Sequence, residues 1–331
     1  MLDGENRVGV LGTGSYLPEK VLDNSELAER YGCSEEWILS RTGIRERRFA
    51  EPGTGASALG LIAAKRALEA AGLGPSDVDL LICATYTPDM AFPSTACIIQ
   101  EQLGAGPAAA FDLQAACSGF VYALITASHF VANNGIRHAL VVASDVNSTI
   151  VDPEDRKVSA LFGDGAGAVV LGPTNHGSGL LSSHLGADGT GGRLFYMPAG
   201  GSRRPASHET VESREHYIKM DGRSLFRFGV DAIIRSSRKA LEAAGLKVED
   251  VDLFIPHQAN LRIIDAGLER LGIPRDRTFI TLDRFANTAA ASIPIALDEA
   301  VRSGRLERDK IVLVTGFGAG LTWGSAVIRW S

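Results

Sequence analysis

The chain of 331 residues has few cysteines, and they are not arranged for metal or disulfide chemistry. No two of them form a CxxC pair, and no histidine cluster lies beside them; they are Cys33, Cys83, Cys97 and Cys117. Zinc sites and disulfide frameworks need such pairs or clusters. The sequence therefore predicts neither a metal site nor a disulfide, and this cysteine usage is typical of a reducing cytoplasm.

Long apolar runs and an excess of positive charge are also missing. The longest apolar stretches fall far short of the roughly 20 residues that a membrane-spanning helix needs. The start of the sequence, MLDGENRVGVLG, lacks the basic and apolar regions of a signal peptide. The formal net charge is −6, which argues against general binding of nucleic acid. We therefore expect a cytoplasmic protein with neither a membrane nor a nucleic acid as its partner.

A dinucleotide-binding loop is a third absence. The first apolar run ends in the sequence GTG at residues 12–14, but the fingerprint requires another glycine at position 17, where Leu17 stands before Pro18. A nicotinamide or flavin nucleotide is therefore not expected at this turn.

What the sequence does contain is a duplication. Residues Arg66–Ile82 and Lys239–Ile255 are identical at twelve of seventeen positions, at an offset of 173 residues (239 − 66). In each copy, helix-like segments alternate with apolar strand-like runs, which favours a mostly parallel sheet covered by helices. We predict an α/β fold with two related halves, residues 1–173 and 174–331, packed as one body with a site between them.

The candidate nucleophile is Cys117, in the stretch FDLQAACSGF. It stands where a strand-like approach gives way to a helix-like run, with the small residues Ser118 and Gly119 after it. The positive end of a helix dipole favours a reactive thiolate. On this stretch alone, Cys117 could also be a small core residue, as most intracellular cysteines are.

The repeat supplies polar partners for this sulfur. His257 follows an apolar strand of the second half, and Asn287 occupies the position that matches Gln114 of the first half. Corresponding ends of the two repeats should face the same crevice, so we expect Cys117, His257 and Asn287 to form one site. The Gly-rich turn GFGAG at 316–320 would allow the Ala319 amide to point at an oxyanion beside the sulfur.

The segment RTGIRERRF brings together Arg41, Arg45, Arg47 and Arg48, with Trp37 shortly before it. Arginines beside a flat aromatic ring suit a phosphorylated ligand with a stacking ring. A solvated basic turn explains the same pattern, and the sequence alone leaves both interpretations open.

Together, these motifs resemble one known family. The matching stretches are FDLQAACSGF, IPHQANLR, FANTAAAS, RTGIRERR, FGDGAGA and GFGAG. They are similar, in the same order, to those of the type III β-ketoacyl-acyl carrier protein synthases, which start bacterial fatty-acid synthesis. The resemblance runs over essentially the whole chain. It implies a thiolase-like fold of duplicated α-β-α-β-α layers with mixed, mostly parallel sheets, and a homodimer.

The resemblance also implies a reaction and roles for the site residues. Cys117 would accept an acyl group from coenzyme A, with the backbone amides of Cys117 and Ala319 as the oxyanion hole. His257 and Asn287 would stabilise the enolate formed when malonyl-acyl carrier protein loses CO2. Acyl-coenzyme A and the carrier protein are thus substrates, and no cofactor or metal is expected. No cysteine follows residue 117, which separates the chain from thiolases that deprotonate with a late cysteine.

Further positions match the family's binding residues. The coenzyme A contacts would be Trp37, Arg41, Arg156 and Asn260, and the acyl pocket would include Phe162 and, from across a dimer interface, Phe92. The carrier-docking segment would be Gln258, Ala259, Asn260, Leu261 and Arg262. Arg227 and Arg238 lie eleven residues apart, three helical turns, and would extend this basic face unless they are ordinary solvated arginines.

Three alternatives stay open at this point. A papain-like protease also orders Cys, His and Asn in this way, although the duplication and the PHQAN context argue against it. A priming synthase or acyltransferase of a polyketide or other specialised pathway would keep the fold and change the primer. A catalytically inactive partner subunit is the third, but such subunits usually lose the cysteine.

Overall fold

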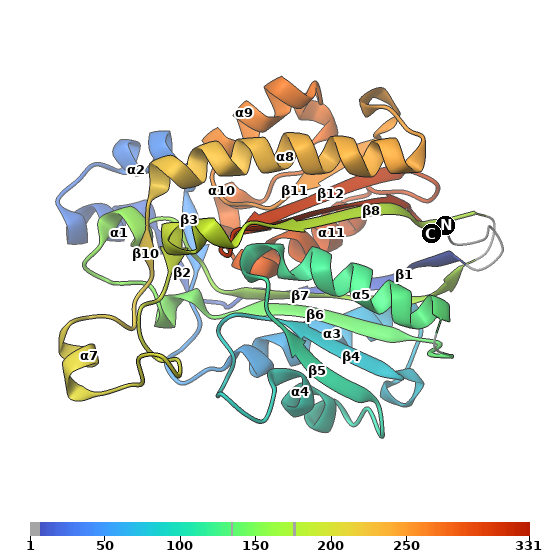
Figure 1. Cartoon of the computed structure of the whole chain (residues 1–331), viewed down its shortest axis with the longest axis horizontal. Coiled ribbons are helices and arrows are strands. Elements are labelled where there is room, and N and C mark those ends of the chain that lie inside the picture. The colour runs from blue at the N-terminus through green and yellow to red at the C-terminus, as the bar shows by residue number, and fades with distance from the viewer. Residues whose placement is uncertain (1–6, 134, 175–176) are drawn as a thin grey trace.

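The computed structural model describes residues 7–133, 135–174 and 177–331. Within them, two large sheets and their helices stack in five layers (Figure 1). The first sheet has the strand order β1 (Arg7–Tyr16), β7 (Gly165–Thr174), β6 (Ala139–Asp145), β4 (Leu80–Ala84), β5 (Ala109–Leu113). The second has the order β11 (Leu253–Pro256), β12 (Ile311–Gly318), β13 (Thr322–Arg329), β8 (Gly179–Ala187).

The helices form the other three layers. The outer face of the first sheet carries α3 (Ala56–Ala71) and α4 (Thr95–Leu103), and that of the second carries α8 (Gly222–Ala244) and α9 (Leu261–Leu271) (Figure 1). Between the sheets lie α5 (Gly119–Asn133) and α11 (Ser292–Arg302). The layered α-β-α-β-α architecture predicted from the sequence is thus confirmed.

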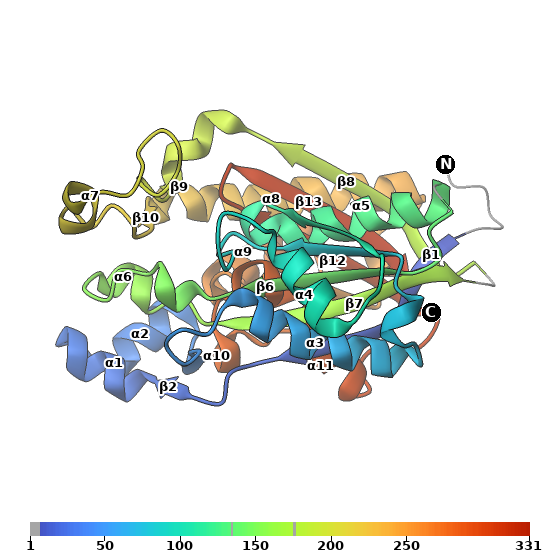
Figure 2. The ribbon, with the colours of Figure 1, turned by 90° about the horizontal axis from the view of Figure 1, so that it is seen from below.

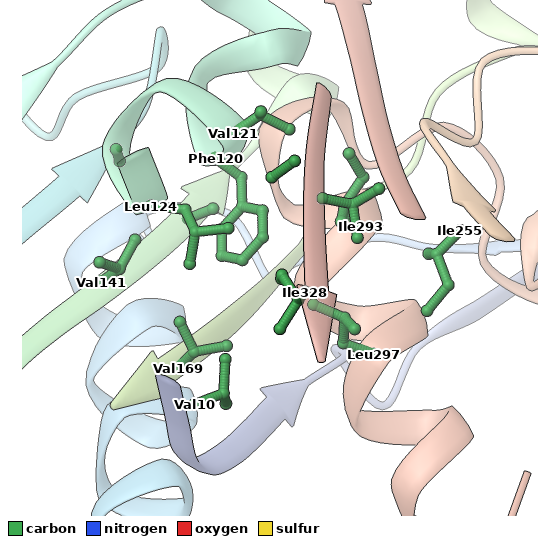
Figure 3. Packing of buried hydrophobic residues seen from close by; sticks show 14 of the residues in the cluster. Val10, Phe120, Val121, Leu124, Val141, Val169, Ile255, Ile293, Leu297 and Ile328 are labelled. Atoms are coloured by element: carbon green, nitrogen blue, oxygen red, sulfur yellow. The ribbon is translucent and has the colours of Figure 1, made fainter. Parts of the chain in front are cut away.

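The middle layer forms because its helices are apolar on more than one side. In α5, Phe120 and Leu124 are buried, and in α11 Ile293 and Leu297 are buried. These side chains meet those of both sheets in one continuous core (Figure 3). A helix that is apolar nearly all round is stable only when it is covered on all sides, which is why each half needs the other.

The sheets are mixed, as predicted, but they are not mostly parallel. Strand β4 pairs in parallel with β5 and β6, and β11 pairs in parallel with β12; the other pairings of these sheets are antiparallel. In each half the last two strands follow one another in the chain. Between β12 and β13 only residues 319–321 intervene, and so short a connection can join only antiparallel strands.

The duplication is visible in the element bounds. At the offset of 173 residues, the first residue of β4 matches that of β11, the last residue of α3 matches that of α8, and Gly119 at the start of α5 matches Ser292 at the start of α11. The sequence predicted a boundary between residues 173 and 174, and this point falls at the end of β7. Because the halves share one core, this division stays a proposal about the repeated unit.

Shorter elements gather at one end of the molecule, opposite the C-terminus (Figure 2). They are β2 (Val21–Asp23), α1 (Asn24–Tyr31), α2 (Glu35–Thr42), β3 (Glu46–Arg48), α6 (Arg156–Ser159), β9 (Phe195–Tyr196), α7 (His208–Glu212), β10 (Lys219–Met220) and α10 (Leu282–Phe285). In the described part of the chain, we find no helix with the length and apolar character needed to cross a membrane.

Candidate active site

One cavity, of about 220 Å³, brings the three predicted catalytic residues together. Cys117, His257 and Asn287 all line it. Cys117 lies in a 3-10 turn directly before α5, His257 follows the end of β11, and Asn287 precedes the turn that leads into α11. Each comes from a strand end or helix start at the same edge of the layers, as the repeat predicted.

The two turns that hold these residues have the same unusual backbone. Ala116, before the cysteine, has a φ of 46°, and Ala289, its equivalent at the offset of 173, has a φ of 51°. Left-handed conformations are uncommon for residues with a Cβ, and they tend to occur where the surrounding structure holds a functional geometry. In the second turn the Ala289 N–H donates to Asn287 Oδ1 over 2.9 Å, which leaves the Asn287 amide NH2 group as a donor.

A close approach of backbone brings β12 to the cysteine. A Cβ added at Gly318 would lie 2.7 Å from the Cys117 nitrogen and 3.0 Å from its Cβ, so only glycine fits at this position. Ala319 follows Gly318 and also lines the cavity, which brings the two proposed oxyanion-hole residues to one place. The Thr322 hydroxyl bonds the carbonyl groups of Ala115 and Ala319, and so ties the two segments together.

The duplication explains why the Cys117 amide is open. The equivalent of Gly318 in the first sheet is Asp145, whose carboxylate accepts the Ala290 N–H over 3.1 Å. Ala290 is the equivalent of Cys117. The first half thus places a carboxyl group, that of Asp145, against the turn of the second half, whereas Gly318 of the second half leaves the matching position beside Cys117 clear.

Burial controls the protonation of these groups. It lowers the pKa of His257 from 6.5 to about 3, so the imidazole is neutral. Burial raises the pKa of the Cys117 thiol, and the charge of Asp145 raises it further. The sequence predicted a thiolate favoured by the helix dipole, whereas the raised pKa favours the thiol as the resting group.

The predicted coenzyme A contacts form a clamp at the mouth of the cavity. The guanidinium carbons of Arg41 and Arg156 lie 4.9 and 5.1 Å from the centre of the Trp37 ring. Asn260 Nδ2 donates to the Arg41 carbonyl over 2.9 Å, and both residues line the cavity. An aromatic ring beside two cations suits a base with attached phosphates.

A buried arginine holds the two sides of this clamp together. Arg47 is fully buried, and its guanidinium donates to the carbonyl of Ala160, which follows α6, and to Asn24 Oδ1 in α1. Burial lowers its pKa to about 10, so it stays charged at neutral pH. Arg47 is therefore a structural residue. It is neither part of a solvated basic turn nor in a position to contact a ligand directly.

The predicted docking segment divides into buried and exposed residues. Arg262 is exposed at the start of α9, and Asn260 caps that helix by accepting the Arg262 N–H over 2.9 Å. Gln258 is fully buried and bonds the Pro256 carbonyl and the Thr281 N–H, so it supports the segment from beneath and offers no surface to a partner. Ala259 lines the cavity, and Leu261 is half-buried.

The other predicted docking arginines lie on α8. Arg227 is exposed. Arg238 is also exposed, and it donates to the Arg270 carbonyl at the far end of α9, so its guanidinium is partly engaged within the chain.

The predicted acyl-pocket residues lie apart in a single chain. Phe162 is buried, lines the cavity and stacks on Phe195, with ring centres 6.2 Å apart. Phe195 also lines a second cavity, of about 550 Å³, together with Ala116 and Ala319. Phe92 lines neither cavity and is 84% exposed.

Other lining residues were not predicted from the sequence. Phe226 and Phe228, on the first turns of α8, line the cavity, as does Phe317. The amphipathic pattern of α8 could have identified the first two, but not the cavity that they face. Within the described residues, no three His, Cys, Asp or Glu side chains are grouped so as to hold a metal ion.

Comparisons with known proteins give the family. The model of the 3-oxoacyl-[acyl-carrier-protein] synthase III family matches residues 111–189, and the model of its C-terminal part matches residues 241–330. A relative from Caldanaerobacter subterraneus, named beta-ketoacyl-[acyl-carrier-protein] synthase III, is 54% identical over 98% of both chains.

Solved structures agree with this result. The 3-oxoacyl-[acyl-carrier-protein] synthase III of Aquifex aeolicus has a TM-score of 0.90 and 43% identity, over 98% of this chain and 100% of that one. The priming beta-ketosynthase of the R1128 polyketide pathway has a TM-score of 0.91 and 40% identity, over 100% of this chain and 98% of that one. The chain therefore belongs to the 3-oxoacyl-[acyl-carrier-protein] synthase III family of condensing enzymes.

Proposed function

We propose that the chain condenses an acyl-coenzyme A primer with the malonyl group on acyl carrier protein, as the initiating step of fatty-acid synthesis. The products are 3-oxoacyl-carrier protein, coenzyme A and CO2. The observation that carries the proposal is the single cavity lined by Cys117, His257 and Asn287. It joins a nucleophile to two neutral hydrogen-bond donors, with no carboxylate among its lining residues.

In the first step, the Cys117 sulfur attacks the thioester carbonyl of the primer. The amides of Cys117 and Ala319 hold the oxyanion, each contributing about 2.7–4 kcal/mol. The C–S bond to coenzyme A then breaks, and the thiol proton ends on the departing sulfur. This exchange of one thioester for another needs no external base, which agrees with a neutral, buried His257.

In the second step, the malonyl carboxylate leaves as CO2, and the electron pair of the broken C–C bond forms an enolate. Donors from His257 and Asn287 stabilise the enolate oxygen. The enolate carbon attacks the acyl-Cys117 carbonyl, and the cysteine leaves as a thiolate that takes up a proton. The carbanion arises by loss of CO2, so the reaction requires no cofactor and no metal.

The substrates would enter past the clamp. Trp37, Arg41 and Arg156 fit the adenine and phosphates of coenzyme A, with Asn260 along the entrance. The carrier protein would dock on the exposed face of Arg262 and Arg227, supported by the residues from Gln258 to Leu261. The location that fits these partners and the unpaired cysteines is the cytoplasm.

A homodimer would complete the acyl pocket. Phe92 is a large apolar residue that is almost fully exposed, and β5 is the last strand of its sheet in the described chain. Exposed apolar side chains and open strand edges are features that association covers. Phe92 of a second copy would close the second cavity, which Phe195 lines and which Phe162 borders through its stacking on Phe195.

The test separates the two steps. The intact mass of the protein is measured after incubation with acetyl-, isobutyryl- and longer acyl-coenzyme A, and malonyl-carrier protein is then added. We expect a stable acyl adduct that Cys117→Ser loses, followed by formation of 3-oxoacyl-carrier protein. Absence of an adduct with every primer would refute the proposal.

The priming beta-ketosynthase of a polyketide pathway supports a second candidate, because its structure is as similar as those of the fatty-acid enzymes. The same adduct experiment distinguishes the two functions. A clear preference for one unusual primer, with little reaction from acetyl- or short branched primers, would favour the specialised pathway.

A further inference from the structure

The buried hydroxyl of Ser292 makes the only side-chain contact that the described structure gives to the His257 ring nitrogens. Ser292 is the first residue of α11 and is 1% exposed. Its Oγ lies 2.7 Å from His257 Nδ1 and accepts the Gln258 N–H over 3.3 Å. The hydroxyl is therefore directed away from its own helix, towards the catalytic imidazole and the chain that follows it.

The donor and acceptor inventory settles the direction of this bond. A backbone N–H can only donate, so the Ser292 oxygen is the acceptor of the Gln258 bond. The hydroxyl hydrogen then remains for one acceptor, and within the described chain the only other partner of this oxygen is His257 Nδ1. If Nδ1 carried the ring proton instead, the hydroxyl hydrogen would be buried without an acceptor, which is costly.

We propose that Ser292 is a positioning residue that holds neutral His257 as the tautomer with its proton on Nε2, so that this nitrogen donates to the enolate. The inference rests on the proposed function for the identity of the enolate. The protonation of one imidazole nitrogen is set by the hydrogen bond that the other makes. An Nε2–H group cannot accept the thiol proton, so Ser292 should matter for condensation and not for acyl transfer from coenzyme A.

The duplication supports this assignment independently. At the offset of 173, Ser292 matches Gly119 and His257 matches Ala84. A Cβ built at Gly119 would lie 3.3 Å from the Ala84 Cβ, so this pair of positions is in contact in the first half too. The first half has only a hydrogen and a methyl group at these positions. Both halves therefore bring these two positions into contact, and only the second half has polar side chains there, Ser292 and His257.

Burial of the pair explains why one hydroxyl is sufficient. His257 is 1% exposed, and its ring packs edge-on against Phe317 with centres 5.2 Å apart. Its backbone N–H is bonded to the Thr315 carbonyl over 2.8 Å. Solvent therefore cannot replace the bond to Nδ1, and among the described residues no other side chain is hydrogen-bonded to a ring nitrogen of His257.

The experiment compares Ser292→Ala with Ser292→Thr, which keeps the hydroxyl. Acyl-Cys117 formation from acetyl-coenzyme A is followed by intact mass, and condensation with malonyl-carrier protein is followed by product formation. We expect Ser292→Ala to lower the rate of condensation roughly 10- to 100-fold while acyl transfer changes by less than about twofold. Ser292→Thr should restore most of the condensation rate.

A spectroscopic readout tests the tautomer without any activity. Protein labelled with 15N-histidine is recorded by NMR, with His257→Ala assigning the signal. We expect the Nε2–H pattern in the wild type and its loss or averaging in Ser292→Ala. The matched control is Ser128→Ala, which removes another buried serine hydroxyl, bonded only to the Leu124 carbonyl within α5. It should change neither rate nor the His257 signal.

Two results would overturn the inference. One is an Nδ1–H pattern in the wild type or an unchanged Nε2–H pattern in Ser292→Ala. The other is an equal loss of both half-reactions in Ser292→Ala, which indicates a merely structural role. Failure of the proposed function looks different, because the wild type itself would then form no acyl adduct or no condensation product, while the NMR result would still stand.

Discussion

The two halves of the molecule share a backbone plan and differ in what they add to it. Helix α3 has 16 residues and α8 has 23, and both end at equivalent positions. The extra turns of α8 therefore lie at its start, where Phe226 and Phe228 line the cavity. The first half contributes Cys117, while the second contributes His257, Asn287 and most of the cavity wall.

The comparison is sharpest at the two turns before the middle helices. Cys117 and Ala290 occupy equivalent positions, and each is preceded by an alanine with positive φ. The Ala290 amide is occupied by Asp145, whereas the Cys117 amide faces Gly318. One duplicated turn is closed by the Asp145 carboxyl group, and the other is open at the Cys117 amide, where we propose that the oxyanion of the substrate binds.

The largest expected effect comes from closing the open turn. In Gly318→Ala, the new methyl group would come 2.7 Å from the Cys117 nitrogen and would force the two backbones apart. We expect acyl transfer to slow by about 10²–10³-fold, the effect of losing one oxyanion donor. The rate of acyl-adduct formation measures it.

Gly74→Ala is the matched control, because a Cβ there has its nearest neighbour, a side-chain oxygen, at 3.6 Å. Equal rates for Gly318→Ala and the wild type would show that the Cys117 amide has no part in the reaction.

The second test uses the buried titratable group of each half. Asp145 has a pKa raised to about 7 by burial, so the folded state keeps a proton that the unfolded chain releases, and stability falls as pH rises from about 4 to 7. His257, with its pKa lowered to about 3, acts in the opposite direction, and its contribution to stability rises with pH from about 3 to 6.5.

Between about pH 4 and 6.5, the contributions of Asp145 and His257 to folding stability change with pH in opposite directions. Each changes by at most about 1.4 kcal/mol per pH unit. Asp145→Asn should therefore make the protein lose stability on acidification more steeply than the wild type. His257→Gln should make the protein lose stability on acidification less steeply than the wild type over the same interval. Urea unfolding as a function of pH measures both, and parallel curves for the two variants would contradict the assigned burial effects.

A smaller effect is expected at the surface, where the halves differ in charge. Arg262 of the second half is exposed, and its equivalent in the first half is Asp89, whose carboxylate bonds Ser57. We expect Arg262→Glu to weaken the carrier-dependent step by about tenfold, since it removes one exposed charge contact and adds a repulsive one. Acyl transfer from coenzyme A should stay nearly unchanged.

Arg308→Glu, another exposed arginine, controls for the change in net charge. If Arg262→Glu slowed both half-reactions equally, the docking role would be wrong.

The smallest effect concerns a bond between the halves. Thr13 of β1 donates to Asp298 of α11 over 2.8 Å, and Ser15 and Arg302 also bond that carboxylate. Thr13→Val keeps the shape and removes one of these donors, so the free energy of unfolding should fall by about 1 kcal/mol. Chemical denaturation measures this change, with Thr210→Val in the distant α7 segment as a comparison.

Much of the comparison between the halves could be predicted from the sequence. Residues at matching positions of a repeat are expected at equivalent places in the fold, even before a structure is known. The match of Arg66–Ile82 to Lys239–Ile255 predicted the paired elements and the meeting of Cys117, His257 and Asn287. The strand directions were partly wrong, since apolar runs identify buried strands but not their orientation. The short connection between β12 and β13 could have shown that these two strands are antiparallel.

Other features depended on side-chain packing that no pattern records. The sequence predicted a thiolate at Cys117, but the degree of burial, which raises the thiol pKa, depends on elements far apart in the chain. Gln258 belongs to a segment with an exposed arginine, yet its own side chain points into the core. Ser292 could have been found by aligning it with Gly119, but only the structure shows that its hydroxyl reaches His257.

The shared middle layer has an evolutionary consequence. Helices α5 and α11 are apolar on the faces that they turn towards each other and towards both sheets, so one repeat alone would present a wide apolar surface to water. A single copy of the unit would therefore need a second copy against this layer to bury these apolar faces. Because both copies are joined in one chain and share this layer, the two turns can differ in sequence, one with a thiol and the other with an asparagine, while the packing between the halves is kept.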